Sequence, residues 1–219
     1  MIIVSWNINN DYRDIDDKIQ MIIELLNTKN IDMFGIQEVI PELYDKLYTR
    51  ISKKLGLDYQ YYISDKPMNK LYFTVLISKC DKAIYDVNFS HTNMGRSFIY
   101  QYIDKFVFVT THLESLPMNE YVRKKQISEI YDHVDVKNII VFGDMNFTNK
   151  GEIFLGFDNL YTEHKDIYTY DSKHNRNATP PYRSNLDRFY TNCRILKYKM
   201  DILTDYNISD HYPIMLTFN

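Results

Sequence analysis

The sequence predicts an α/β protein in which two packed sheets carry helices on their outer faces. Three observations lead to this prediction: strand-like and amphipathic helical segments alternate at the N-terminus, five β-rich segments follow between residues 58 and 112, and the chain then returns to a helix and further strands. The 219 residues, 45% of them hydrophobic, suit one domain, residues 1–219, with a sizeable core.

The first part of the chain reads as two strands that alternate with two helices. Residues 2–8 (IIVSWNI) and 31–39 (IDMFGIQEV) are apolar runs with polar ends, which is typical of buried strands. Residues 14–30 form the first helix, which Asp14 is expected to cap, and Pro41 opens the second. The apolar faces of these helices consist of Ile15, Ile19, Ile22, Ile23 and Leu26, and of Leu43, Leu47, Ile51 and Leu55.

The remaining segments are mostly strand-like. The five β-rich segments, separated by turn residues, predict antiparallel strands at 58–64, 71–78, 82–90, 97–103 and 105–112. A helix is then expected at 117–134 and a strand at 138–146, followed by a loop-rich stretch from 148 to 186. The last segments, 186–192, 194–203 and 211–219, again read as strands.

Composition excludes several classes of function. The net charge of −3 gives no global positive field, so nucleic-acid binding would depend on a local patch. Cys80 and Cys193 lack zinc-type spacing. The N-terminus reads as a strand and not as a signal peptide, and no apolar stretch approaches the ~20 residues that span a membrane. We therefore expect a soluble, intracellular monomer, cytoplasmic or nuclear, without membrane insertion.

Polar side chains end several of the predicted buried strands. They are Asn7, Gln37 and Glu38, His112, Asp144 and Asn146, and the pair Asp210 and His211 that precedes the last strand. If these strand ends converge, they form one pocket of carboxylates, amides and imidazoles. Such a set suits a hard cation such as Mg²⁺, which prefers oxygen ligands, together with a phosphate group. The competing interpretations are ordinary structural roles: a turn at Asn7, an acid near the start of the next helix at Glu38, a surface histidine at His211, and an Asx turn at Asp144 and Asn146.

Six short motifs give this pattern a family resemblance. The segments SWN, IQEVIP, TTHLES, GDMNF, NLDRFY and SDHYP occur in the order of the endonuclease/exonuclease/phosphatase superfamily, and they span residues 4–216. The resemblance implies a four-layered αββα sandwich of two mixed, mostly antiparallel sheets, and a Mg²⁺-dependent phosphoesterase in which Mn²⁺ may substitute. IQEVIP, NMGRSF, THLES and YTYD most resemble the 5′-tyrosyl-DNA phosphodiesterase branch, which implies a 5′ DNA end carrying a tyrosyl adduct as the substrate.

The resemblance also implies roles for the polar strand ends. Glu38 is expected to hold the metal, with Asp210 near the metal or its waters. Asp144 would orient or deprotonate the attacking water, while Asn146 and Asn7 contact the phosphate. On an extended chain Asp144 and Asn146 point the same way. His211 would stabilise a phosphate oxygen or act as acid or base, oriented by Asp187.

A second group of residues is expected to bind the substrate. His112 and Ser115 match family positions that contact the scissile phosphate; the competing interpretation is that Glu114 and Ser115 begin the next loop. Arg96 would supply a charge-assisted contact. Tyr170, at a position where the tyrosyl-DNA branch tends to have Trp, would stack on a base. Arg188 belongs to a local basic patch that also includes Lys173, His174, Arg176 and Arg183.

Three functional interpretations follow from the sequence. The preferred one is hydrolysis of 5′-phosphotyrosyl bonds in DNA end processing. The second keeps the chemistry and changes the substrate to abasic DNA, RNA or a phospholipid headgroup. The third is a catalytically silent binding module, which the full set of acids, amides and imidazoles argues against.

Overall fold

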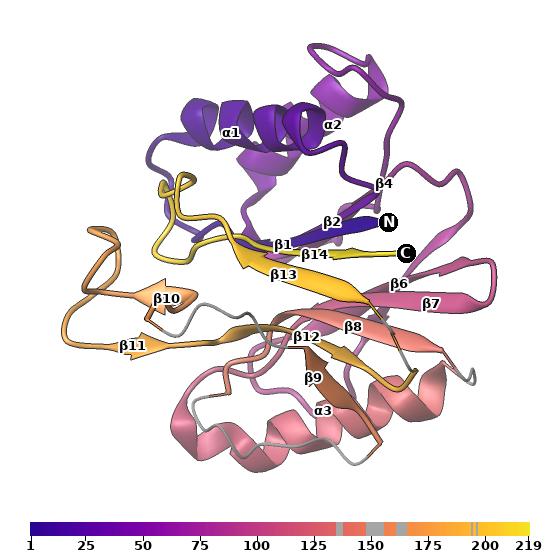
Figure 1. The fold of residues 1–219 in the computed structure, drawn as a ribbon, viewed down its shortest axis with the longest axis vertical. Coiled ribbons are helices and arrows are strands. Elements are labelled where there is room, and N and C mark those ends of the chain that lie inside the picture. The colour runs from indigo at the N-terminus through magenta and orange to yellow at the C-terminus, as the bar shows by residue number, and fades with distance from the viewer. Residues whose placement is uncertain (135–137, 148–155, 161–165, 194, 196) are drawn as a thin grey trace.

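Two six-stranded sheets pack face to face between helices in the computed structural model (Figure 1). The structure describes residues 1–134, 138–147, 156–160, 166–193, 195 and 197–219. Helices α1 (Ile15–Thr28) and α2 (Pro41–Ser52) cover one sheet, and α3 (Glu120–His133), preceded by the 3₁₀ turn Pro117–Asn119, covers the other. The predicted αββα sandwich is confirmed.

The first sheet has the strand order β13-β14-β1-β2-β4-β3. Its strands are β1 (Ile2–Asn7), β2 (Met33–Val39), β3 (Tyr62–Ile63), β4 (Phe73–Ser78), β13 (Tyr198–Ile202) and β14 (Ile214–Phe218). Within it β1 and β2 pair in parallel and the other neighbours are antiparallel. The parallel pair brings the polar ends of β1 and β2 to the same edge.

The second sheet has the order β5-β6-β7-β8-β12-β9. Its strands are β5 (Ile84–Asn88), β6 (Ser97–Ile103), β7 (Phe106–His112), β8 (Ile139–Asp144), β9 (Asp158–Leu160) and β12 (Asp187–Thr191). A separate two-stranded hairpin, β10 (Tyr170–Asp171) with β11 (Arg183–Ser184), projects beyond the sandwich (Figure 1). β7 and β8 are the parallel pair of this sheet.

Alternation of side chains along the strands separates three cores. On β8, Ile140 and Phe142 pack in the core between the sheets, whereas Val141 packs toward α3. The two sheets approach closely at Gly35, where a Cβ atom would lie 2.2 Å from Thr110 Oγ1. Because successive side chains on a strand alternate faces, Asp144 continues the row of Ile140 and Phe142 and points between the sheets.

Local structure differs from the sequence predictions at four places. α2 ends at Ser52, so Leu55, which was predicted on the apolar face of this helix, lies beyond it and is exposed. Asp14 precedes α1 in a left-handed conformation and makes no side-chain cap. The strand predicted at 58–64 is limited to Tyr62–Ile63, and the stretch predicted as loop-rich contains β9, β10 and β11. Parts of that stretch, and residues 194 and 196 of another predicted strand, lie outside the described residues.

Candidate active site

Three polar residues form a row across the end of the second sheet. In the strand register His112 on β7 lies beside Asp144 on β8, and Asp187 on β12 lies on the other side of Asp144. All three are at most 2% exposed. Each side chain lies on the strand face that also carries the apolar residues buried between the sheets: Asp144 and His112 follow Phe142 and Phe108 on their strands, and Asp187 precedes Phe189. The row therefore faces the first sheet.

Asn7, at the end of β1, connects the two sheets at this row. Its amide nitrogen Nδ2 donates to Asp144 Oδ2 at 2.9 Å and to Glu38 Oε1 at 3.3 Å. Its oxygen Oδ1 accepts a hydrogen bond from the backbone N–H of Asn9 at 3.0 Å. Because that N–H fixes which end of the amide is the oxygen, the nitrogen must face the two carboxylates.

Glu38 reaches the site through an irregularity in β2. The register of β2 against β4 shifts between Ile36 and Val39, and Glu38 has a φ of 60°. Regular alternation would place Glu38 on the helix-covered face with Phe34 and Ile36, so the bulge turns its carboxylate toward Asn7. Strained backbone of this kind concentrates at functional sites.

Gly143 makes room for Asp144. Its φ is 148°, and a Cβ atom there would lie 1.9 Å from the carbonyl oxygen of Thr111 on β7. Only glycine fits such a contact between parallel neighbours. The glycine before Asp144 is therefore required by the close approach of β7 and β8.

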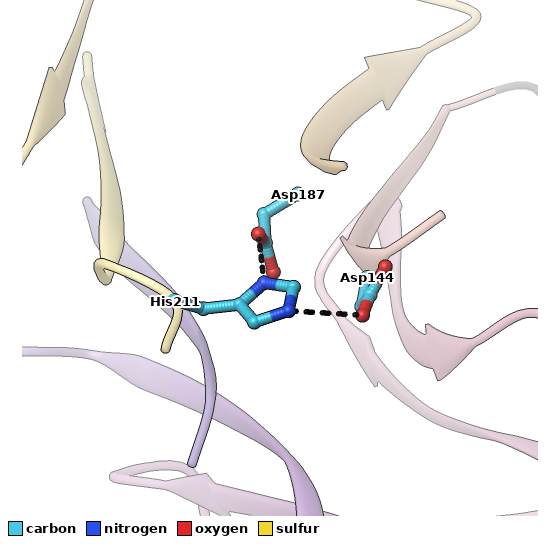
Figure 2. Close-up of side chains that lie close together, drawn as sticks. All are labelled: Asp144, Asp187 and His211. Atoms are coloured by element: carbon cyan, nitrogen blue, oxygen red, sulfur yellow. Dashed lines mark hydrogen bonds and ion pairs between the residues drawn. The ribbon is translucent and has the colours of Figure 1, made fainter. Parts of the chain in front are cut away.

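His211 and Asp187 form a close pair (Figure 2). His211 Nδ1 lies 2.7 Å from Asp187 Oδ2, and the opposite ring atom, Nε2, lies 3.9 Å from Asp144 Oδ2. Burial lowers the pKa of His211, but the charge and hydrogen bond of Asp187 and the charge of Asp144 outweigh it and raise the pKa well above the usual value of 6.5. His211 is thus an imidazolium that presents Nε2–H to the site.

His112 has the opposite partner. Its Nδ1 lies 2.9 Å from the guanidinium nitrogen NH1 of Arg96, which can only donate. The ring proton must therefore be on Nε2, which lies 3.4 Å from Asp144 Oδ2. Burial, the charge of Arg96 and the charge of His211 lower the pKa of His112 well below 6.5. His112 is a neutral donor.

Asp144 lies between these two rings, and its carboxylate has a raised pKa. Burial and the nearby Asp187 raise its pKa from 3.8 to about 6, against the opposing effects of His211 and of hydrogen bonds from Asn7 and Asn146. A base with a pKa close to neutral can accept a proton from water and be ionised at physiological pH. This matches the role that the resemblance implies for Asp144.

The other predicted residues on this side lie around the row. The Oγ atom of Ser115 accepts a hydrogen bond from Arg96 NH2 at 3.0 Å, which leaves its own proton to donate to a substrate oxygen. The side-chain amide of Asn146 donates to Leu113 O. The chain is not extended beyond Asp144, because Asn146 has a φ of 52° and its N–H donates to Asp144 Oδ1 in an Asx turn. The two side chains therefore do not share a direction by strand alternation.

Tyr170 and the arginines of the basic patch differ in where the structure places them. The ring of Tyr170 lies edge-on against His211, with centroids 5.2 Å apart. Arg188 is on the opposite face of β12 and donates to three protein oxygens. Its side chain points away from the row, since successive residues on a strand face opposite sides, so its predicted substrate contact gains no support from the geometry. Arg183 is also neutralised, by Asp171 at 2.7 Å, which His174 joins.

The residues at Glu38 fit a hard cation. Its two oxygens each accept one N–H, from Asn7 and from the backbone of Asn10, and each retains a lone pair for a metal. Asp210 is half-buried, and its Oδ1 lies 3.2 Å from the Ser209 hydroxyl, which donates its one proton to the backbone oxygen of Asn7 at 2.6 Å. Asp144, Asp187 and His211 also have ligand atoms within 4.8 Å of one another, but a protonated His211 has no lone pair at Nε2 to offer.

No sequence pattern predicted the residues that hold His211 or flank Arg96. Trp6 Nε1 donates to the backbone oxygen of His211 at 3.0 Å, from the motif SWN that drew attention only to its Asn. Tyr72 lies under the guanidinium of Arg96, 5.3 Å from its ring centroid, and is one of 20 tyrosines with no distinguishing pattern. Tyr72, Met94, Arg96 and Lys70 line a small pocket beside the His112 side of the row.

Comparison with known proteins gives one family and a group of related structures. The model described as Endonuclease/Exonuclease/phosphatase family matches residues 4–211. Tyrosyl-DNA phosphodiesterase 2 from Danio rerio is 25% identical over 254 aligned positions, which cover 99% of this chain and 66% of that protein. The chain thus spans about two thirds of the length of this relative.

Solved structures share the fold over the whole chain. Danio rerio TDP2 complexed with a single-strand DNA product superposes with a TM-score of 0.79 at 24% identity, covering 100% of this chain and 98% of that one. Truncated Caenorhabditis elegans TDP2 gives 0.74 at 21%, covering 99% and 96%. A Leptotrichia buccalis protein described by the same family name gives 0.75 at 17%, covering 100% and 99%.

Proposed function

The chain belongs to the endonuclease/exonuclease/phosphatase family, and on that premise we propose that it is a Mg²⁺-dependent phosphodiesterase that hydrolyses 5′-phosphotyrosyl bonds at DNA ends. That it is a metal-dependent phosphoester hydrolase follows from the family, whose resemblance is confirmed. The finer assignment includes a monomer with one catalytic domain, residues 1–219, and a 5′ DNA end as partner. No helix among the described residues is long and apolar enough to cross a membrane.

The observation that carries the proposal is the arrangement of donors around Asp144. A carboxylate with a pKa of about 6 lies between the N–H of a neutral His112 and the N–H of a cationic His211. Donors fixed in a buried site stabilise the charge that develops on phosphoryl oxygens without reorganising. The same site has a base for the water, so the arrangement suits phosphodiester hydrolysis.

In the proposed reaction Asp144 takes a proton from water as the water oxygen bonds to phosphorus. The bond from phosphorus to the phenolic oxygen breaks, so the products are a 5′-phosphate and a tyrosine whose phenolate takes a proton from His211 or solvent. Asn7, His112, Ser115 and His211 hold the phosphoryl oxygens. Mg²⁺, or Mn²⁺ in its place, would be held by Glu38 with Asp210 nearby, and would supply positive charge to the same oxygens.

Two features support a phenol as the leaving group. A phenolate is a weaker base than a sugar alkoxide, so it needs less acid assistance. The pocket beside Arg96 offers the ring of Tyr72, the thioether of Met94 and a guanidinium, which are partners that an aromatic ring accepts. The name of the Danio rerio relative points to the same substrate class.

The test is hydrolysis of a 5′-tyrosyl oligonucleotide with Mg²⁺ and with EDTA, beside an abasic duplex and sphingomyelin. We expect Mg²⁺-dependent release of tyrosine at the highest kcat/KM of the three. Glu38→Ala and Asp144→Asn should each lower kcat by ~10³-fold or more, as removal of groups that act only in the transition state does. Glu120→Ala, at an exposed carboxylate on α3, is the control. Near-normal turnover in either site variant, or preference for another substrate, would contradict the proposal.

A further inference from the structure

Helix α1 buries a lysine among its apolar residues. Lys18 is 1% exposed, and its ammonium Nζ donates to Asn9 O at 2.8 Å, to Asp11 O at 3.1 Å and to Asp11 Oδ1 at 3.1 Å. All three hydrogens of the ammonium therefore have an acceptor. All three acceptors belong to the loop between β1 and α1, residues 8–14, which we call the β1–α1 loop.

The β1–α1 loop supplies the backbone donors that orient the proposed metal site. The N–H of Asn9 donates to Asn7 Oδ1 and thereby fixes the direction of the Asn7 amide. The N–H of Asn10 donates to Glu38 Oε2 at 3.1 Å. Asn9 itself has a φ of 60°, so this stretch holds a conformation that an unsupported chain rarely adopts.

Burial of Lys18 costs more free energy than a residue that only packs a helix would require. Its neighbours on the buried face of α1 are isoleucines and leucines, and burying an ammonium has a large desolvation cost unless it is paired. Its one carboxylate partner, Asp11, has a side chain that is 31% exposed and is shared with the surface residue Arg13. The two backbone carbonyls therefore complete the pairing, and the hydrogen bonds from the ammonium to the loop offset its desolvation cost.

We infer that Lys18 is a positioning residue that fixes the β1–α1 loop, and through it Glu38 and Asn7, in the geometry that binds the divalent cation. The inference rests on the proposed function, which places the cation at Glu38. Lys18 touches neither substrate nor metal; it acts through Asn9 and Asn10. Partners that orient metal ligands in this way change metal affinity by about 10–100-fold when they are removed.

Mn²⁺ binding, measured from the loss of the free-ion EPR signal without substrate, tests the inference independently of turnover. Lys18→Met should weaken Mn²⁺ binding about tenfold and speed amide hydrogen exchange in residues 8–14, with exchange in the rest of α1 unchanged. Arg13→Met is the matched control: Arg13 also pairs with Asp11 but is 82% exposed and contacts no loop carbonyl, so wild-type binding is expected.

Two further variants separate the possible failures. Asp11→Ala changes a loop residue at the surface, keeps the helix intact and should weaken Mn²⁺ binding by about threefold, so the inference stays testable if Lys18→Met does not fold. Lys18→Arg, which retains the charge, should bind Mn²⁺ better than Lys18→Met. Unchanged Mn²⁺ binding and loop exchange in Lys18→Met, or in Asp11→Ala if the former is unfolded, would overturn the inference. Wild-type binding in Glu38→Ala would instead remove the metal placement on which it rests.

Discussion

His112 and His211 face the same carboxylate from two sides, yet they differ in charge. Their Nε2 atoms lie 3.4 and 3.9 Å from Asp144 Oδ2. Behind His112 the Nδ1 atom meets the guanidinium of Arg96, and behind His211 it meets the carboxylate of Asp187. The first partner leaves a neutral ring and the second leaves an imidazolium.

This difference shows that the residue in contact with Nδ1 of each imidazole determines the charge of the ring, and with it the chemistry that the ring can perform. Both rings present an N–H to the centre of the site, so both can stabilise phosphoryl oxygens. Only His211, as an imidazolium, can give a proton to the leaving oxygen and become a neutral imidazole. His112 is restricted to hydrogen bonding, because burial beside Arg96 and His211 opposes a second ring proton.

The largest expected effect comes from removing the charge behind His211. Asp187→Asn keeps the size of the side chain but removes the charge that raises the pKa of His211, so burial should then lower that pKa. We expect kcat for a 5′-tyrosyl oligonucleotide to fall by ~10³-fold, since an analogous change behind a catalytic histidine costs ~10⁴-fold. NMR titration of the His211 ring gives the pKa directly. An unchanged His211 pKa would show that Asp187 does not set the charge of His211, which contradicts the comparison of the two histidines.

A smaller effect is expected on the other side of the site. Arg96→Met removes the donor that fixes the tautomer of His112 and one of the charges that lower its pKa. We predict that the pKa of His112 rises and that kcat/KM falls by ~10²-fold, the size of loss typical for one fixed donor. Arg183→Met is the control, because Arg183 lies outside the row and pairs with Asp171. A normal kcat/KM in Arg96→Met would show that Arg96 does not act through His112.

The same comparison explains how much the sequence could predict. Strand periodicity was enough to predict two packed sheets with helices outside, and the polar strand ends predicted that His112 and Asp144 would meet if the strand ends converge. Asp187 came only from the family resemblance, and regular register and alternation place it beside Asp144. The partner behind an imidazole is not a periodic feature. Arg96 was expected at the phosphate, and its contact with His112 Nδ1 depends on how a loop folds across the end of β7.

Errors occurred where the chain departs from regular geometry or where one residue shifts the face. Arg188 was expected beside Asp187 at the substrate, but a neighbour of Asp187 on a strand points the other way, and Arg188 donates to Phe147 O instead. The prediction that Asp144 and Asn146 point the same way assumed an extended chain through both residues, but the strand ends at Asp144. Glu38 shows the opposite case, since its bulge brings to the site a side chain that plain alternation would have turned away.

The smallest predicted effect concerns stability and tests the environment of Asp144. The pKa of Asp144 is raised in the folded protein from 3.8 to about 6, so its favourable contribution is present below pH 3.8 and is lost as pH rises through 6. At pH 7 the ionised group therefore destabilises the metal-free fold by up to ~3 kcal/mol. Asp144→Asn removes this charge but breaks one of the hydrogen bonds from Asn7 and Asn146, at ~1–2 kcal/mol.

The net result for Asp144→Asn in EDTA at pH 7 is a gain of ~1 kcal/mol, or a Tm higher by ~2–4 °C. At pH 3.5 wild-type Asp144 is largely protonated in both states, so the gain should disappear there. Thermal unfolding followed by circular dichroism at the two pH values measures the difference. Equal stabilisation of the variant at both pH values would show that its gain comes from packing and not from the loss of the charge. A variant that is destabilised at pH 7 would mean that Asn7, His112 and His211 already compensate the charge in full, and that Asp144 is a weaker base than its burial implies.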